Sequence, residues 1–266
     1  MPKVLVNGIN LYYELHGPED GDVLVLSNGI MMSTASWALQ TRVLEKHLHV
    51  LLYDCRGMWQ SDHPAGPYNM EQHADDLAGL LDALGIQKAH IGGISYGSEI
   101  SLVFALRYPE RTQSLLVIDG VSEVPPFLKA QTYPWRMAAE RNDPELLLRT
   151  SVHMNFSEGW MGANQAYIDA SVAAYSRLDM PSFISMMDSF ASYNITDRLS
   201  EIKCPTLIAV GEEDLIKGRR YAEIMTARIP QAEYMVVPGA GHALCLDKPD
   251  ALNTLLLGFV LKHGAN

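Results

Sequence analysis

Six short apolar runs recur along the chain, and Gly, Pro, Asn or Asp bounds each of them. Compact runs rich in β-branched residues between such turn-forming residues are typical of strands. The runs are nearly continuous and do not alternate with polar positions, which predicts parallel strands covered on both faces. The predicted strands are residues 23–28, 49–54, 90–95, 115–120, 206–211 and 232–237.

Helical patterns fill most of the intervals between these strands. They cover residues 37–47, 70–84, 96–107, 219–229 and 249–263, and Gly85 fits a helix C-cap. Repeated strand–helix alternation predicts an α/β fold with a mostly parallel, doubly wound sheet. Asn7-Gly8 stands between two strand-like runs at the start of the chain, which predicts an antiparallel hairpin at one edge.

One long stretch lacks this alternation. From about residue 121 to about residue 197 we find only helical segments, rich in Met, Phe, Tyr and Trp. We therefore predict an inserted helical cap, residues 122–196, in a core made of residues 1–121 and 197–266. Open α/β sheets bind ligands at the carboxyl ends of their strands, and we expect the cap to cover that edge.

Composition excludes several classes of function. The net charge is −11 and no Lys/Arg cluster interrupts it, so nucleic acid and anionic membrane surfaces are poor partners. No apolar run is long enough to cross a bilayer, and the first residues do not resemble a signal peptide. Three cysteines without CxxC spacing indicate reduced thiols in a cytoplasmic protein and no zinc site. We also expect a monomer or homodimer that needs no cofactor.

The segment Gly93-Ile94-Ser95-Tyr96-Gly97 joins a predicted strand directly to a predicted helix. In that context a G-x-S-x-G sequence predicts a nucleophile elbow, whose sharp turn requires small residues on both sides of the serine. The turn lifts the Ser95 hydroxyl above the sheet at a helix N-terminus, where developing negative charge is stabilised. We predict Ser95 as the nucleophile.

A serine nucleophile needs a base and an acid that orients it. His242 lies in a glycine-rich loop after the last predicted strand, where packing gives a histidine little purpose, so we predict it as the base. Asp214 follows the strand 206–211 and precedes His242, in the chain order Ser, Asp, His. Asp119, at the end of another predicted strand, is the competing candidate for the acid, and Asp214 is favoured.

A tetrahedral intermediate also needs backbone donors. One is expected from the N–H of Tyr96, directly after the nucleophile. The second is expected from the loop Asn28-Gly29-Ile30-Met31 after the first parallel strand, through the N–H of Ile30. Large, soft side chains in this loop and in the cap suit an adaptable apolar group of a substrate. The candidates for lining the pocket are Asn28, Met31, Trp59, Met154, Trp160 and Met187.

Together these motifs resemble the α/β-hydrolase superfamily over essentially the whole chain. The resemblance rests on GISYG, GEED, GAGH and the segment Asp54-Cys55-Arg56-Gly57 with Ser61, in which Trp59 stands where the family usually has glycine. The segment SNGI resembles 3-oxoadipate enol-lactonases. The N-terminal part is also similar to the 3-hydroxyacyl transferase of rhamnolipid synthesis. A dicarboxylate-like substrate would need a positive partner that the sequence does not place.

The resemblance implies a hydrolase that acts through a serine and an acyl-enzyme intermediate. We expect a carboxylic ester hydrolase for small to medium apolar acyl esters. A lactonase, a thioesterase or a hydroxyacyl transferase could use the same residues. A ligand-sensing protein with little turnover is the alternative from another class. The expected partner is a small-molecule ester or thioester.

Overall fold

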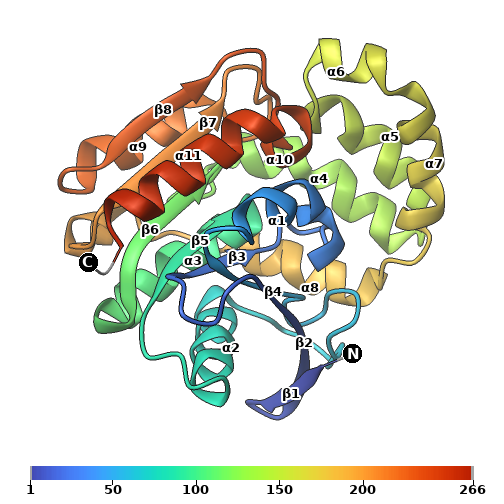
Figure 1. Cartoon of the computed structure of the whole chain (residues 1–266). Helices are drawn as coiled ribbons and strands as arrows, with labels where there is room; N and C mark the ends of the chain where they lie inside the picture. The colour runs from blue at the N-terminus through green and yellow to red at the C-terminus, as the bar shows by residue number, and fades with distance from the viewer. Residues whose placement is uncertain (1, 265–266) are drawn as a thin grey trace.

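The computed structural model describes residues 2–264, and its centre is an eight-stranded sheet (Figure 1). The strand order is β1-β2-β4-β3-β5-β6-β7-β8. The pairs β1–β2 and β2–β4 are antiparallel, and every other neighbouring pair is parallel. The strands are β1 (Lys3–Val6), β2 (Ile9–His16), β3 (Val23–Ser27), β4 (His49–Tyr53), β5 (Ala89–Ile94), β6 (Thr112–Ile118), β7 (Thr206–Gly211) and β8 (Glu233–Val237).

This sheet confirms the predicted mostly parallel α/β fold, and its edge hairpin follows the expected turn. Asn7 and Gly8 both have positive φ, 48° and 81°, as a two-residue hairpin turn requires. Four of the predicted strands end earlier than expected, before Asn28, Asp54, Ser95 and Asp119. Ser95 and Asp119 have φ of 56° and 49°, which a strand cannot accommodate. Ser95 therefore turns the chain directly into the following helix, and Asp119 begins a loop.

Side chains alternate between two hydrophobic layers, one on each face of the sheet. Val25, Leu51 and Ile91 point into one layer, whereas Leu24 and Leu52 point into the other. The first layer is covered by α2 (Met70–Ala83), α3 (Tyr96–Arg107) and α9 (Arg219–Arg228). The second is covered by α1 (Ala38–Leu44) and α11 (Pro249–Lys262). Burial on both faces explains why the strands read as continuous apolar runs.

The predicted core helices match these elements to within a few residues at each end. The largest difference is at the first, where a 3₁₀ turn, η1 (Thr34–Trp37), precedes a shorter α1. Gly85 follows α2 with φ of 71°, as a glycine cap should. The remaining short elements are η2 (Pro109–Arg111), η3 (Thr196–Glu201) and α10 (Leu244–Asp247).

Five helices lie between β6 and β7, and we call them the helical insertion. They are α4 (Pro126–Glu140), α5 (Pro144–Asn155), α6 (Glu158–Ala163), α7 (Gln165–Tyr175) and α8 (Met180–Ala191). In Figure 1 α5, α6 and α7 form a lobe at the upper right, beside the sheet. The two segments that join the insertion to the sheet are bridged at Glu123 and Asn194. The predicted limits, residues 122 and 196, lie in these joining segments. Within residues 2–264 no helix is long and apolar enough to cross a membrane.

Candidate active site

Ser95 occupies a strained turn between β5 and α3. Its φ of 56° and ψ of −118° fall outside the usual regions for a residue with a side chain. The flanking glycines allow the backbone to approach closely. A Cβ on Gly97 would lie 2.1 Å from the carbonyl oxygen of Ser27, and a Cβ on Gly93 would lie 2.4 Å from the Gly97 carbonyl. Side chains at either position would therefore push the turn away from the sheet.

The imidazole of His242 lies between Ser95 and Asp214. His242 Nε2 is 2.8 Å from Ser95 Oγ, and His242 Nδ1 is 2.8 Å from Asp214 Oδ2. The other oxygen of Asp214 accepts hydrogen bonds from the N–H groups of Ile216 and Lys217, at 2.7 and 2.8 Å. A carboxylate that accepts from Nδ1–H leaves Nε2 free to accept the serine proton. The structure thus brings together the three residues that the motifs singled out.

Asp119, the competing candidate for the acid, lies beside Asp214. Its Oδ1 accepts a hydrogen bond of 2.8 Å from the N–H of Gly211. Complete burial and the neighbouring Asp214 carboxylate raise the pKa of Asp119 well above its usual range. This shift favours the neutral, protonated form of Asp119. Asp119, Asp214 and His242 offer potential metal-ligand atoms within 4.8 Å of one another, but the Asp214–His242 hydrogen bond already occupies two of these atoms.

The two residues expected to supply backbone donors, Tyr96 and Ile30, line a cavity that also reaches Ser95. Tyr96 begins α3, and an N–H in the first turn of a helix has no acceptor within the helix. Ile30 belongs to a turn closed by a hydrogen bond of 2.9 Å from Met32 N–H to the Gly29 carbonyl. Ile30 and Ser95 line the same cavity. The Tyr96 hydroxyl, 3.0 Å from His73 Nε2, anchors the start of α3 from below.

Asn28 does not line this cavity, contrary to expectation. Its side chain is fully buried, with Nδ2 donating to Asp54 at 3.2 Å and Oδ1 accepting from the Trp37 indole at 2.9 Å. Asp54 also accepts from the N–H of Thr34, and burial raises the pKa of Asp54 to about 6. Asn28 therefore supports the loop that carries Ile30 and makes no contact with the cavity.

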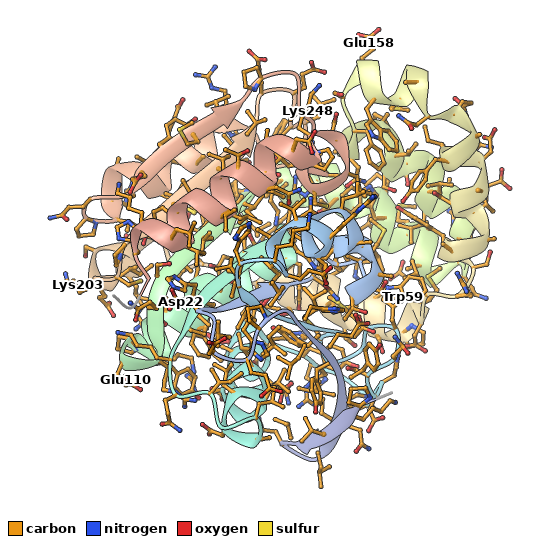
Figure 2. The ribbon with its side chains drawn as sticks, in the orientation of Figure 1. Asp22, Trp59, Glu110, Glu158, Lys203 and Lys248 are labelled. Carbon is orange, nitrogen blue, oxygen red and sulfur yellow. The ribbon has the colours of Figure 1, made fainter. Side chains whose placement is uncertain are left out.

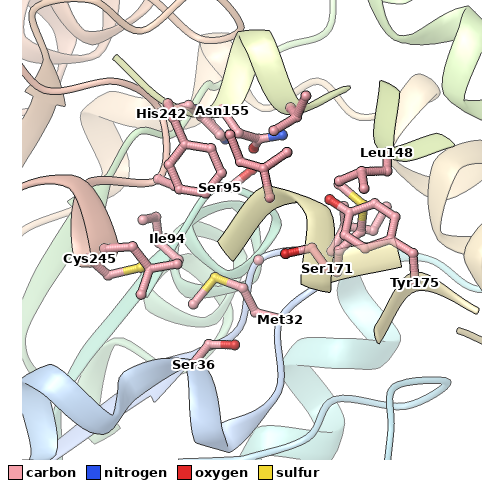
Figure 3. A pocket seen from close by; sticks show the side chains of 18 of the residues that line it. Met32, Ser36, Ile94, Ser95, Leu148, Asn155, Ser171, Tyr175, His242 and Cys245 are labelled. Atoms are coloured by element: carbon pink, nitrogen blue, oxygen red, sulfur yellow. The ribbon is translucent and has the colours of Figure 1, made fainter. Parts of the chain in front are cut away.

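A cavity of about 140 Å³ opens beside Ser95, between the sheet and the helical insertion. Figure 3 shows Ser95 and His242 on one side, with Ser171 and Tyr175 of α7 on the other. Its wall is mostly apolar, with a few polar side chains. The predicted Met31 lies in this wall. Residues of the wall that sequence reasoning did not select include Met32, Ser36, Trp135, Leu148, Asn155, Ser171, Tyr175 and Cys245.

The other pocket candidates lie elsewhere. Met187 lines a smaller cavity that also reaches Ser95. Trp59 lines a separate small cavity near Ile30 and lies at the side of the molecule next to the insertion (Figure 2). Its φ of 39° explains why glycine is usual at that position. Met154 and Trp160 do not line the cavities at Ser95, because Met154 packs into the core and Trp160 stacks on Phe156 at 3.9 Å.

Cys245 contributes a thiol to the wall of the larger cavity. Its thiol is buried, and burial raises its pKa to about 12. The thiolate is the nucleophilic form, so Cys245 stays an unreactive thiol at neutral pH. The one-turn helix α10 that carries Cys245 also carries Asp247, which accepts from the N–H groups of Gly241 and Ser157 at 2.8 and 2.7 Å. Asp247 thereby ties the loop of His242 to the insertion.

Comparisons with known proteins agree with this geometry. The sequence pattern of the family described as "alpha/beta hydrolase fold" matches residues 22–249. The "Putative carbamate hydrolase RutD" of Azorhizobium caulinodans is 29% identical over 97% of this chain and 98% of its own. The enol-lactonase of Burkholderia xenovorans LB400 superimposes with a TM-score of 0.91 at 25% identity, over 98% of this chain and all of the other.

A third similar protein is MGS-M2, an alpha/beta hydrolase enzyme from a Medee basin deep-sea metagenome library. Its crystal structure superimposes with a TM-score of 0.94 at 28% identity, over 100% of this chain and 99% of the other. The family pattern spans most of the chain, and the similarity to these proteins extends from end to end. This chain therefore belongs to the α/β-hydrolase family and is a hydrolase of that fold.

Proposed function

We propose that this protein is a carboxylic ester hydrolase that forms an acyl-enzyme on Ser95. One observation carries the proposal. A hydrogen-bonded chain from Asp214 through His242 to Ser95, with both links 2.8 Å long, ends at a mostly apolar cavity of about 140 Å³. That arrangement supplies a nucleophile, a base and an orienting carboxylate. The cavity suits a carboxylic ester with a small to medium apolar part.

The reaction needs only side chains, backbone N–H groups and water. His242 Nε2 takes the Ser95 proton while Oγ attacks the ester carbonyl carbon. The N–H groups of Tyr96 and Ile30 stabilise the resulting oxyanion. The intermediate collapses, and the alcohol oxygen leaves with the proton from His242. Water then gives its proton to His242 and attacks the acyl-enzyme, which releases the acid and restores Ser95.

The orientation of His242 is central to these steps. Asp214 accepts from Nδ1–H and stabilises the imidazolium that forms when Nε2 is protonated. The buried position of His242 and Asp214 strengthens this interaction, because less water screens it. The similar enol-lactonase of Burkholderia xenovorans is named for the hydrolysis of a lactone, which supports cleavage of an acyl–oxygen bond on this fold. Lactones and thioesters therefore belong in the first substrate panel beside simple esters.

The test is steady-state hydrolysis of p-nitrophenyl esters from acetyl to decanoyl, with Ser95→Ala protein run in parallel. We expect turnover in the unaltered protein and a loss of about 10⁴-fold or more in the variant. Labelling of Ser95 by a fluorophosphonate, read by mass spectrometry, shows independently whether the serine is activated. Failure to hydrolyse any ester, or equal turnover in Ser95→Ala, would refute the proposal. Labelling without steady-state turnover would instead favour a ligand-sensing protein.

A further inference from the structure

A second, smaller cavity of about 20 Å³ also reaches Ser95, and one of its walls is charged. Trp135, Met187 and Phe190 of the insertion form apolar walls, and Lys217 also lines the cavity. The volume is close to what one water molecule needs. Only one small group of a bound molecule, such as a single oxygen atom, can therefore occupy it, and Lys217 is the one charged side chain in that wall.

Lys217 is buried with a single acidic partner. Its Nζ lies 2.6 Å from Glu99 Oε2, and the two side chains are 3% and 0% exposed. The ammonium also lies 4.6 Å from the centroid of the Phe190 ring. A lysine ammonium carries three N–H donors. Within residues 2–264, Glu99 is the one side chain that accepts a hydrogen bond from Lys217 Nζ, so donor capacity remains beside the cavity.

The ligand group that fits this wall is a neutral oxygen acceptor. Glu99 already balances the charge of Lys217, and its other oxygen accepts from the N–H of Val121 at 2.9 Å. A substrate carboxylate would bring an additional buried negative charge without a counterion of its own, which is costly. A carbonyl or hydroxyl oxygen would accept a charge-assisted hydrogen bond without that penalty.

The position of His242 indicates which part of an ester points toward Lys217. His242 lines the larger cavity and is not part of the wall of the smaller one. In the proposed reaction the alcohol oxygen must receive its proton from His242, so the alcohol part lies in the larger cavity. The acyl part then extends toward Lys217.

We propose that Lys217, held by Glu99, forms a subsite for a carbonyl or hydroxyl oxygen on a short acyl chain. This subsite rests on the proposed ester hydrolysis at Ser95. It predicts a substrate class: esters of short oxygenated acids with an apolar alcohol part. It also places a lysine in the wall of a cavity that reaches Ser95, which the sequence alone did not do.

The test compares benzyl 3-hydroxybutanoate and benzyl 3-oxobutanoate with benzyl 3-methylbutanoate. The first and last differ by one hydroxyl in place of a methyl group, and all three release benzyl alcohol. The quantity measured is the ratio of kcat/KM for each oxygenated ester to kcat/KM for 3-methylbutanoate. Intrinsic reactivity cancels when this ratio is compared between protein variants. We expect the Lys217→Met/Glu99→Gln variant, which removes both buried charges, to lower the ratio by about tenfold or more.

Matched variants separate a subsite from a structural role. Lys262→Met removes an exposed lysine that pairs with Glu233 at 2.8 Å, and we expect its ratio to stay within about twofold of the unaltered protein. Lys217→Gln/Glu99→Gln, whose amides can bond to each other, is the second test variant in case the first does not fold. Fluorophosphonate labelling of Ser95 identifies folded protein in each case.

Three outcomes decide the matter. A reduced ratio in a variant that still labels supports the subsite. An unchanged ratio in a labelled variant overturns the subsite and leaves the proposed function intact. Failure of the unaltered protein to hydrolyse any ester, p-nitrophenyl esters included, overturns the proposed function and the subsite together.

Discussion

The acid partner of His242 can be decided by two isosteric substitutions, Asp214→Asn and Asp119→Asn. Asp214 Oδ1 accepts two backbone N–H groups, so an asparagine there would keep its oxygen on that side. Its NH₂ group would then face His242 Nδ1, which would have to accept instead of donate. The proton of the neutral imidazole would then sit on Nε2. A protonated Nε2 cannot accept the Ser95 proton.

The magnitude follows from that wrong tautomer. The corresponding exchange in a serine protease costs about 10⁴ in kcat, and we expect a similar loss here for Asp214→Asn. A loss of that size corresponds to about 5.5 kcal/mol in the barrier. Asp119→Asn should change kcat by less than about tenfold. Burial and the Asp214 carboxylate raise the pKa of Asp119, which favours its neutral form. Asparagine keeps the Oδ1 acceptor for Gly211 N–H and tolerates the φ of 49°.

The assay is kcat on the best p-nitrophenyl ester, measured with both variants and the unaltered protein at pH 7.5. Thermal unfolding of each variant serves as the control, because a global loss of structure would lower kcat for another reason. The reasoning is refuted if Asp119→Asn loses activity while Asp214→Asn, equally folded, keeps it. That result would transfer the acid role to Asp119.

Two further predictions concern the fold around the site. Gly97→Ala, whose Cβ would lie 2.1 Å from the Ser27 carbonyl oxygen, should abolish fluorophosphonate labelling and destabilise the protein by about 2 kcal/mol or more. Gly258→Ala, in open space on α11, should instead stabilise the protein by about 0.5–1 kcal/mol. Urea unfolding measures both changes in stability, and equal effects of the two substitutions would contradict the steric argument. Burial lowers the pKa of His73 to about 3, so below pH 6.5 the unfolded chain binds a proton that the folded chain does not. Stability should therefore be complete above pH 6.5 and fall by about 1.4 kcal/mol per pH unit below it, toward pH 3. Stability should depend less steeply on pH in His73→Gln than in His47→Gln, which replaces an exposed histidine. Identical slopes in the two variants would contradict the role assigned to His73.

Much of the core could be predicted because its signals are local. Parallel strands covered on both faces leave continuous apolar runs, and glycines mark turns that other residues cannot adopt. Ser95 and His242 were recognisable for the same reason, since the elbow and the glycine-rich loop are local backbone requirements. The choice between Asp214 and Asp119 was less secure. Both residues follow a strand at the same edge of the sheet, and local sequence does not show which carboxylate reaches His242.

The lining of the cavities could not be read from the chain. Met154 is buried in the core, while its neighbour Asn155 lines the larger cavity. Helical periodicity shows that a helix has a buried face, but a cap helix can bury that face against the core, another helix or a cavity. Trp160 illustrates this limit, because it stacks on Phe156 and donates its indole N–H to Leu246.

The sequence by itself determined the order of strands and helices, the elbow at Ser95 and the loop of His242. Each depends on neighbours along the chain, through backbone sterics and hydrophobic periodicity. Only the tertiary structure decided that Asp214 bonds to His242, that Asn28 faces inward, and that Lys217 meets Glu99 beside Ser95. Glu99 and Lys217 are 118 positions apart, and their contact exists because β5 and β7 end at the same edge of one sheet.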